Sequence, residues 1–440
     1  VWWVMPRMLG RRHLIRLLGM LGLAGVWVVI EWTRTWVLSG FPWLPLGASQ
    51  WERATVLQVA AYTGVYGVSF VLVSMNIGFA AYAHRLLWEG ATGFSRRSQE
   101  FFLALFLLLT CISLHFQEVF NRHLFIEPLA RVTFVQPYIP QVVKWDPAKR
   151  LAILAELEQA TIAGAAAKPD LIVWPEAVTP LSVMDDEGLR MFVESLARRV
   201  QAPMLLGSIA VENSGTPEEK WLNGAFVVRP GTGLAPDYYA KRHLVPFGEY
   251  VPLRPVLGWL SKFVPIGGDF TPGLSASPLL LPLRDKLILV GPLICYEDVF
   301  PQLARHSVQS GATLLAVLTN NAWYGEGGAA YQHAAHSVLR AVETRRPVLR
   351  CGNGGWSGWI DELGIVRASV TNKEGSIYFR GVATANISRD TRWIGRESFY
   401  VIHGDWFVLA SVMMAAFGAV ILRSGPPMAP RANRNPPSAP

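Results

Sequence analysis

One stretch of sequence decides the fold: Leu287-Ile-Leu-Val-Gly-Pro-Leu-Ile-Cys-Tyr-Glu-Asp298. Its first part is an apolar run, and its second part holds a cysteine, an aromatic residue and two carboxylic acids. A short apolar run bounded in this way is typical of a strand buried in an α/β domain. Ligands gather at the carboxyl ends of strands in such domains. The stretch therefore predicts a buried strand with Cys295 at a functional edge.

Strand-like and helical patterns alternate across residues 130–390, which is the order expected of an α/β domain. Pro147 suits the first turn of a helix, and Asp146 before it suits the N-cap. The predicted strands cover residues 131–136, 171–174, 204–209, 225–228, 287–294, 313–318 and 348–350. The predicted helices cover residues 147–167, 189–200 and 329–345. The fold class that follows is α/β.

The composition indicates a membrane portion beside this domain. Hydrophobic residues make up 51% of the 440 residues and charged residues make up 16%, whereas soluble domains carry about 25% charged residues. The net charge is +8, but the basic residues are spread along the chain or lie beside apolar runs. That distribution favours membrane topology and argues against a nucleic-acid partner.

Four apolar segments are candidates for membrane spans: residues 17–30, 54–83, 101–116 and 406–422. The second segment has no charged residue and is long enough to cross a bilayer with tilt, whereas each shorter segment could instead be a buried core helix. Basic residues cluster before the first segment, after the second and after the fourth. Four crossings would place all three clusters in the cytoplasm, and residues 31–53 and 121–401 would face outward.

The chain has three cysteines, and none belongs to a metal-binding pattern, so no metal site is predicted. Cys111 lies in an apolar run and suits packing, whereas Cys295 lies at a predicted strand end. A cysteine nucleophile needs a nearby base or cation to release its thiolate. Two residues could supply them: Glu176 follows the apolar run 171–174 by way of a proline, and Lys241 follows two tyrosines and an alanine.

These three residues could divide the chemistry of acyl transfer between them. Cys295 would attack an acyl carbon, Glu176 would take up and return the proton, and Lys241 would stabilise the negative oxygen of the tetrahedral intermediate. Taken singly, each has an ordinary alternative: a packing cysteine, a carboxylate in a surface turn and a solvated lysine. Their combination favours a Glu–Lys–Cys site for acyl transfer.

Three short motifs resemble the signatures of the carbon–nitrogen hydrolase, or nitrilase, superfamily: Trp174-Pro-Glu176, Lys241 with Phe247-Gly-Glu249, and Ile294-Cys-Tyr-Glu297. Further motifs narrow the resemblance to the apolipoprotein N-acyltransferase family. These motifs are Gly40-Phe-Pro-Trp-Leu44, Val65-Tyr-Gly-Val-Ser-Phe70, residues 136–145, His243-Leu-Val-Pro-Phe-Gly-Glu-Tyr-Val-Pro252, Thr319-Asn-Asn-Ala-Trp-Tyr-Gly325 with Gln332-His333, and Arg345-Arg-Pro-Val-Leu-Arg350 with Asn353. The resemblance covers roughly residues 27–422 and joins membrane and soluble motifs in order.

The resemblance implies a nitrilase-like αββα sandwich inserted between transmembrane α-helices. The expected domains are an N-terminal membrane region over 1–125 with about three helices, a catalytic domain over 126–400, a transmembrane helix over 401–423 and a disordered, proline-rich tail over 424–440. The family usually has about eight spans, so we expect about four N-terminal spans to be absent from this chain. The first apolar segment also looks like a signal peptide, but no small-residue cleavage site follows it, and we expect an anchor.

The resemblance also implies the reaction. Cys295 would take an acyl chain from a membrane phospholipid as a thioester and pass it to the α-amino group of the diacylglyceryl-modified N-terminal cysteine of an apolipoprotein. No cofactor is expected, and the protein would act as a monomer at the outer, periplasmic face of a bacterial inner membrane. A phospholipid does not readily leave the bilayer, because each buried methylene contributes about 0.8 kcal/mol. The site must therefore stand at the membrane interface.

Five further residues enter the predicted site by resemblance: Glu249, Glu297, Tyr296, Trp145 and Asn223. The two glutamates would be additional essential acids, and the two aromatic residues would line the pocket. The asparagine would be a supporting polar contact. The alternatives are that Glu249 only orients the lysine, that Glu297 only forms a salt bridge, and that Trp145 only packs in a lid.

Two positions depart from the family pattern: Asn321 stands where an aspartate is usual, and Gly354 stands where a second asparagine is usual. Cys351 lies near them but has no accompanying base, so a second nucleophile is not expected. Residues 251–268 form either an apolar arm that touches lipid or an amphipathic helix packed on the domain. Two other functions compete with acyl transfer, namely a membrane-tethered amidase that uses water as acceptor and a non-enzymatic membrane scaffold.

Overall fold

The computed structural model describes residues 13–87, 98–144, 146–259 and 269–423. The chain divides into two compact units. The sandwich unit comprises Arg34–Val68 and Cys111–Asp405, and the helical unit comprises Val1–Thr33, Ser69–Thr110 and Trp406–Pro440. Three predicted features lie outside the described residues, namely Trp145, residues 260–268 of the arm and the tail over 424–440.

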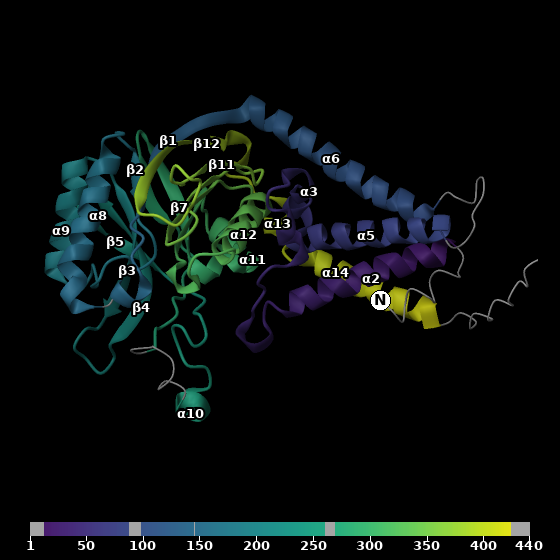
Figure 1. Ribbon diagram of the computed structural model, residues 1–440, viewed down its shortest axis with the longest axis horizontal. Coiled ribbons are helices and arrows are strands. Elements are labelled where there is room, and N and C mark those ends of the chain that lie inside the picture. Colours follow the sequence, from purple (N-terminus) through teal and green to yellow (C-terminus); the bar gives the residue numbers. More distant parts are fainter. Residues whose placement is uncertain (1–12, 88–97, 145, 260–268, 424–440) are drawn as a thin grey trace, which may run out of the picture. The chain divides into compact units, whose positions relative to one another are not determined.

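The sandwich unit is built on two six-stranded sheets (Figure 1). The first sheet, in the order β12-β1-β2-β3-β4-β5, holds β1 (Ile126–Gln136), β2 (Leu171–Val173), β3 (Met204–Glu212), β4 (Lys220–Arg229), β5 (Gly233–Ala240) and β12 (Gly381–Asp390). The second sheet, in the order β11-β10-β9-β8-β7-β6, holds β6 (Leu279–Leu283), β7 (Lys286–Ile294), β8 (Leu314–Asn320), β9 (Val348–Asn353), β10 (Gly358–Ile360) and β11 (Val366–Ser369). Apolar side chains from both sheets, such as Phe134 and Val290, meet in one buried core.

Helices cover the outer faces of both sheets. α8 (Arg150–Ala165) and α9 (Glu187–Val200) pack on the first sheet. Side chains alternate along each strand, so Leu205 of β3 joins the core between the sheets while Met204 packs with these helices. α11 (Pro301–Gln309) and α12 (Ala329–Thr344) pack against strands of the second sheet. The predicted αββα sandwich is therefore confirmed.

Short elements complete the sandwich unit. They are the α-helices α3 (Ala54–Leu57), α4 (Ala60–Thr63), α7 (Gln141–Lys144), α10 (Arg254–Leu257) and α13 (Phe399–His403), and the 3-10 helices η1 (Val37–Ser39), η2 (Leu46–Gln50), η4 (Pro147–Lys149), η6 (Cys295–Val299), η7 (Ala322–Tyr324) and η8 (Thr391–Trp393). The predicted cap is present, because the Asp146 carboxylate accepts a hydrogen bond of 2.9 Å from the amide of Ala148. α10 belongs to the predicted arm, and the side chains of Leu253 and Val256 beside and within it are exposed.

The parallel strands determine where a site can form. β1, β2 and β3 run parallel in the first sheet, and β7, β8 and β9 run parallel in the second. β5 is antiparallel to β4, which is antiparallel to β3, so β5 also ends at the carboxyl edge of its sheet. Glu176 follows β2, Lys241 follows β5 and Cys295 follows β7. The three candidate residues therefore all emerge where strands end.

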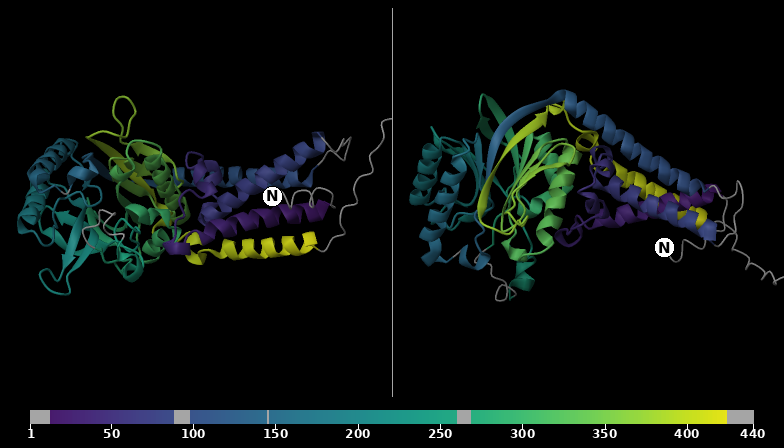
Figure 2. Two further views of the ribbon diagram at one scale, coloured as in Figure 1. Left: turned by 60° about the horizontal axis from the view of Figure 1, so that its bottom comes forward. Right: turned by 45° about the horizontal axis from the view of Figure 1, so that its top comes forward.

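The helical unit contains most of four described helices that are long and apolar enough to cross a membrane: α2 (His13–Thr33), α5 (Val65–Leu87), α6 (Gln99–Phe125) and α14 (Trp406–Arg423). Figure 2 shows α2 in purple beside α14 in yellow. Small residues line their contact, since a Cβ on Gly22 would lie 3.2 Å from the Cα of Gly418. Close backbone approach of this kind is typical of helices that pack in lipid.

The second apolar segment, predicted as a span over 54–83, is a candidate span only from Val65 onward, and its first part is wrongly assigned. The chain forms α3 and α4 first, and only α5 is a long helix. Gly64 ends α4 with a φ of 67°, which suits glycine, and a Cβ at this position would lie 2.6 Å from the ring of Tyr400. Gln58 in the same stretch is buried and donates a hydrogen bond of 2.9 Å to the carbonyl of Leu363. This first part of the apolar segment therefore belongs to the sandwich unit, and its lack of charge reflects burial in protein.

Candidate active site

Cys295 lies at the turn from β7 into η6. Its φ is 50°, a left-handed conformation that is uncommon for a residue with a side chain. Such strained positions cluster at functional sites and persist only where the surroundings hold them. Here the carbonyl of Cys295 accepts a hydrogen bond of 3.1 Å from Nε2 of His333 on α12. The side chain is 8% exposed, so the sulfur lies in a largely enclosed site.

Glu176 stands just beyond β2, and its carboxylate is held on both oxygens. Oε1 accepts a hydrogen bond of 2.7 Å from the side-chain amide of Asn223 on β4, and Oε2 accepts one of 2.9 Å from the backbone amide of Asn320 at the end of β8. Gly207 of β3 makes room for this arrangement, because a Cβ there would lie 2.6 Å from the Cα of Glu176. The carboxylate therefore joins the two sheets.

Lys241 follows β5 and is 1% exposed. Its Nζ lies 2.9 Å from the Glu249 carboxylate and 3.4 Å from Oε1 of Glu176. Burial lowers the pKa of Lys241, but attraction to Glu249 and Glu176 outweighs burial and holds that pKa above its usual value. The ammonium group is therefore charged throughout the physiological pH range.

Asn223 and Glu249 complete this cluster. The side-chain amide of Asn223 donates to Glu176 and also to Oε1 of Glu249, the second bond being 3.0 Å long. Oε2 of Glu249 accepts a hydrogen bond of 2.8 Å from the backbone amide of Val245. Glu249 is thus placed both to orient Lys241 and to face the same space as Glu176.

At rest, the shifts in pKa keep the proton on the sulfur and the negative charge on the carboxylate. Burial, with the negative charge of Glu176, raises the pKa of the Cys295 thiol to about 12. Burial alone would raise the pKa of Glu176, but Lys241, Lys144 and hydrogen bonds from Asn223 and Cys295 together lower it. At neutral pH the thiol therefore keeps its proton while Glu176 is ionised, and the sulfur can lose that proton to Glu176 as a general base while it bonds to the acyl carbon.

Glu297 and Tyr296 follow Cys295 in the chain but face other groups. Glu297 is fully buried and accepts hydrogen bonds from the hydroxyl of Tyr239 at 2.9 Å and from the backbone amides of Arg242 and Ile294, each at 2.7 Å. It therefore ties η6 to the segment that carries Lys241, and burial raises the pKa of its carboxyl group.

Tyr296 packs on the segment that precedes η2. Its hydroxyl donates a hydrogen bond of 3.0 Å to the carbonyl of Gly40, and its ring stacks on Phe41 with 6.2 Å between ring centres. The ring of Tyr296 therefore packs against the segment around Phe41, and its role in a substrate pocket stays a prediction. Trp145, the other aromatic residue of the predicted pocket, lies outside the described residues.

A buried polar network lies behind Cys295, and sequence reasoning did not assign it a role. Nε2 of His333 lies 2.8 Å from the Asp298 carboxylate, which also accepts hydrogen bonds of 2.6 Å from Arg350 and 2.5 Å from Ser337. Burial would raise the pKa of Asp298, but His333 and Arg350 hold it well below its usual range. Asn321, which stands where the family pattern has an aspartate, lies 2.9 Å from Nδ1 of His333, so it belongs to this network.

Lys144 was also missed as a site residue by sequence reasoning. It lies in residues 136–145, which resemble the family as a whole, but no short motif singles it out. It is the last residue of α7 and is 3% exposed. Burial lowers the pKa of Lys144 to about 8, although attraction to Glu176 and Cys295 opposes this shift. Its helix is held at the site, because the side-chain amide of Asn320 donates a hydrogen bond of 2.7 Å to Gln141.

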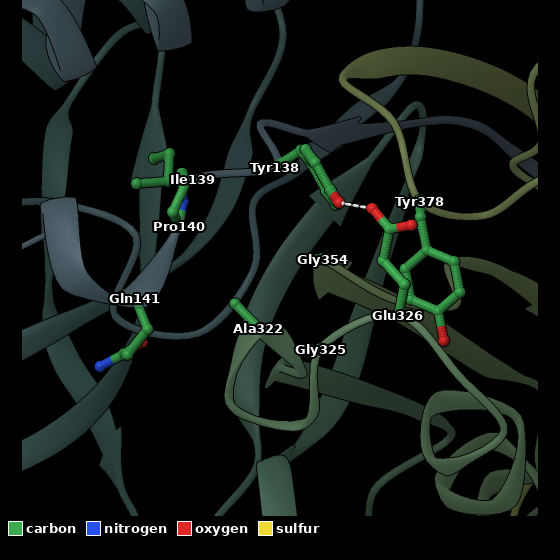
Figure 3. Close-up of a pocket in the computed structure, with 9 residues that line it drawn as sticks. All are labelled: Tyr138, Ile139, Pro140, Gln141, Ala322, Gly325, Glu326, Gly354 and Tyr378. Carbon is green, nitrogen blue, oxygen red and sulfur yellow. Dashed lines mark hydrogen bonds between the residues drawn. The ribbon is translucent and has the colours of Figure 1, made fainter.

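A cavity of about 270 Å³ opens beside this cluster (Figure 3). Gln141 and Ala322 line it near the site, and Glu326 and Tyr378 line it on the other side, where the hydroxyl of Tyr138 donates to Glu326. Gly354, which stands where the family pattern has a second asparagine, lines the cavity too, and a Cβ there would lie 3.2 Å from Ala322. Cys295 is not among the lining residues, so this cavity adjoins the cluster without containing the nucleophile. Within the described ranges, no group of three or more His, Cys, Asp or Glu side chains could hold a metal ion.

Known families and proteins resemble this chain along most of its length. The carbon–nitrogen hydrolase family model matches residues 131–392, and the model of the apolipoprotein N-acyltransferase N-terminal domain matches residues 1–78. An apolipoprotein N-acyltransferase of Geobacter metallireducens is 34% identical over 405 residues, which are 90% of this chain and 73% of that protein. One of Pseudomonas syringae pv. tomato is 31% identical over 424 residues, which are 96% of this chain and 77% of that protein. Among solved structures, an amidase from Nesterenkonia sp. aligns at 17% identity with 63% of this chain and 97% of its own, with a TM-score of 0.46.

Proposed function

We propose that this chain, which belongs to the apolipoprotein N-acyltransferase family, moves an acyl group from a membrane phospholipid to the amino terminus of a lipid-modified apolipoprotein through a thioester on Cys295. One observation carries the proposal: a buried cluster of Cys295, Glu176 and Lys241 stands at strand ends of a sandwich, and the described part of the chain also holds four candidate membrane spans. A hydrolase of small soluble amides has no need of such spans.

In the first half-reaction, Glu176 takes the thiol proton while the sulfur attacks the ester carbonyl of a phospholipid. The carbonyl oxygen becomes an oxyanion, and the Lys241 ammonium stabilises it electrostatically. When the intermediate collapses, the carbon–oxygen ester bond breaks and the leaving alkoxide takes the proton from Glu176. The products are a lysophospholipid and an acyl thioester on Cys295.

In the second half-reaction, the free α-amino group of the apolipoprotein attacks the thioester carbonyl. Glu176 accepts a proton from the attacking nitrogen, and the carbon–sulfur bond breaks as the new amide bond forms. The proton then passes from Glu176 to the departing sulfur, which restores the thiol. Because water would compete with the amine, the 8% exposure of Cys295 has a chemical value as well as a structural one.

The same proposal includes the setting of the enzyme. The basic residues near the ends of the spans support an orientation in which one chain crosses a bacterial inner membrane several times and residues 31–53 and 121–401 face its outer, periplasmic side. The enzyme acts as a monomer that takes a diacyl phospholipid from the bilayer. Its proposed parts are an N-terminal membrane region over 1–125, a catalytic domain over 126–400, a transmembrane helix over 401–423 and a tail over 424–440. Phosphatase fusions after residues 45 and 92 test the orientation, since only the first should be active in the periplasm.

Intact-protein mass spectrometry tests the reaction. The purified protein is incubated with phospholipid of one known acyl chain, and a diacylglyceryl-cysteine peptide is then added. We expect an adduct of one acyl chain on wild-type protein, its removal by neutral hydroxylamine and its transfer to the peptide. Cys295→Ala should give no adduct, and Cys351→Ala is the matched control that should keep it.

Two results would contradict the proposal. An adduct of equal size on Cys295→Ala would place the acyl group elsewhere. Release of free fatty acid without acylated peptide would indicate a hydrolase that uses water as acceptor.

A further inference from the structure

The charges around Cys295 do not balance within the three predicted catalytic groups. Lys241 lies between two carboxylates, at 2.9 Å from Glu249 and 3.4 Å from Glu176. One ammonium and two carboxylates leave one negative charge in a buried space. The proposed reaction keeps this net charge, because the thiol proton neutralises Glu176, and it moves the negative charge first to the sulfur and then to the carbonyl oxygen while the Glu249 carboxylate keeps its own. Like charges in a buried site oppose such a step strongly.

Lys144 supplies the missing positive charge. Lys144 and Lys241 are the two buried lysines among the residues that the structure describes. Residues three apart on a helical turn face the same side, so Lys144 shares the face of Gln141, which accepts a hydrogen bond from Asn320. The backbone amide of Asn320 in turn donates to Glu176. A short chain of hydrogen bonds thus holds the face of α7 against the reacting carboxylate.

We propose that Lys144 is the second cation of the active site, and that it offsets the charge of the two carboxylates so that negative charge can form on Cys295 and on the substrate carbonyl oxygen. This inference rests on the proposed acyl transfer. Lys241 directs its hydrogen bonds at Glu249 and Glu176, and Lys144 interacts electrostatically with both Glu176 and Cys295. Lys241 therefore holds the two carboxylates in place by hydrogen bonds, and Lys144 offsets their negative charge.

The proposal predicts an alkaline limit to acylation. The charged and titratable groups that act on Lys144 electrostatically are Glu176, Cys295, Lys241 and Glu249. Burial lowers the pKa of Lys144 to about 8, and the ammonium form exists below that pH. The compensating charge is therefore present at neutral pH and is lost as the pH rises through that value. An arginine in this position would stay charged, because its guanidinium does not lose a proton in this range.

The test measures the rate of acyl-enzyme formation in a single turnover from pH 6 to pH 10. Lys144→Met keeps the apolar stem, Lys144→Arg keeps the charge, and Lys373→Met is the matched control in an exposed turn. We expect Lys144→Met to slow acylation about 10- to 100-fold at pH 7 and to lose the alkaline decline that wild-type protein shows above about pH 8. Lys144→Arg should be faster than Lys144→Met and should hold its rate to higher pH than wild type. Lys373→Met should match wild type.

Thermal unfolding of each variant separates folding from charge. If Lys144→Met acylates as fast as Lys373→Met, or if Lys144→Arg keeps the wild-type alkaline decline while folded, the inference is overturned. The wild-type adduct itself reports on the proposed function, because its absence would overturn acyl transfer through Cys295 before Lys144 is considered. An adduct on wild type with no dependence on Lys144 would overturn only the present inference.

Discussion

Cys295 lies between two buried polar clusters that look alike in composition and differ in what they hold. The reacting cluster consists of Glu176, Lys241, Glu249 and Asn223. The supporting cluster consists of Glu297, Asp298, His333, Ser337 and Arg350. Both are rich in carboxylates and both are almost fully buried. In the reacting cluster the carboxylates face an ammonium group and a thiol, whereas in the supporting cluster they face backbone amides, a guanidinium group and hydroxyls.

The difference shows that acids next to the nucleophile in sequence and acids next to it in space have different roles. Glu297 and Asp298 follow the nucleophile directly, yet both are turned away from the sulfur toward fixed partners. Glu176 and Glu249 come from distant parts of the chain and reach the sulfur side. We therefore expect substitutions in the reacting cluster to reduce the rate, and substitutions in the supporting cluster to reduce stability first.

The largest expected effect is that of Glu176→Gln. Glutamine keeps the shape and the hydrogen bond from the Asn320 amide but cannot accept the thiol proton. The rate of acyl-enzyme formation should fall by about 10²- to 10⁴-fold, which is the usual contribution of a general base. The time course of the adduct mass measures it, and Glu374→Gln in an exposed turn is the matched control. A rate within a few-fold of the control would assign the proton transfer to another group.

The next effect should be that of Asp298→Asn on stability. The change leaves the guanidinium group of Arg350, which is 0% exposed, without its carboxylate partner. Breaking one side of a buried ion pair costs about 3–5 kcal/mol. At about 2–4 °C for each kcal/mol in a domain of this size, the thermal midpoint of the sandwich unit should fall markedly.

The same substitution should change the acid response of the sandwich unit. Folding lowers the pKa of Asp298, so its contribution to stability is fully present above the unfolded pKa of about 3.9. That contribution is lost as the pH falls through the lower, folded pKa. Unfolding scans from pH 5 down to pH 2 should therefore show a shallower acid loss for Asp298→Asn than for wild type. An unchanged slope would mean that Asp298 carries no net stabilising charge.

The sequence predicts the central strands well because they are apolar on both faces. β2, β7, β8 and β9 each overlap a predicted run. The strands that were missed lie at or near the sheet edges, where one face meets solvent and the apolar pattern weakens. β6 is an edge strand that even holds Pro282, and β5, which carries the chain to Lys241, is one of the two edge strands of the first sheet.

Predicting the site depended on short motifs, and this limited it in two ways. Motifs name residues without saying where a side chain points, so Glu297 entered the predicted site although its carboxylate is turned toward Tyr239 and Arg242. Residues without a motif stayed invisible. Lys144 reaches the cluster only because α7 meets the end of β8, and no local pattern in the sequence encodes that contact.

Gly207→Ala should have an intermediate effect on both the stability of the sandwich unit and the rate of acylation. The new Cβ would lie 2.6 Å from the Cα of Glu176, so either β3 or the backbone of Glu176 must move. Overpacking of this kind costs about 1–3 kcal/mol, and a displaced carboxylate should also slow acylation. Thermal unfolding and the adduct time course measure the two effects. Gly231→Ala is the matched control, because a Cβ there would have no atom within 4 Å.

The smallest effect should be that of Cys351→Ala, a substitution that tests why Cys295 reacts and Cys351 does not. Burial raises the pKa of both thiols, so burial and pKa do not distinguish a nucleophile here, and the neighbours must. The Cys351 thiol donates to the carbonyls of Val135 and Val173 at 3.4 and 3.3 Å, and neither group can take its proton. Its loss should cost about 1 kcal/mol of packing and leave the adduct intact. If the adduct disappeared while the protein stayed folded, the contrast between a carboxylate and a carbonyl neighbour would not be what makes Cys295 react.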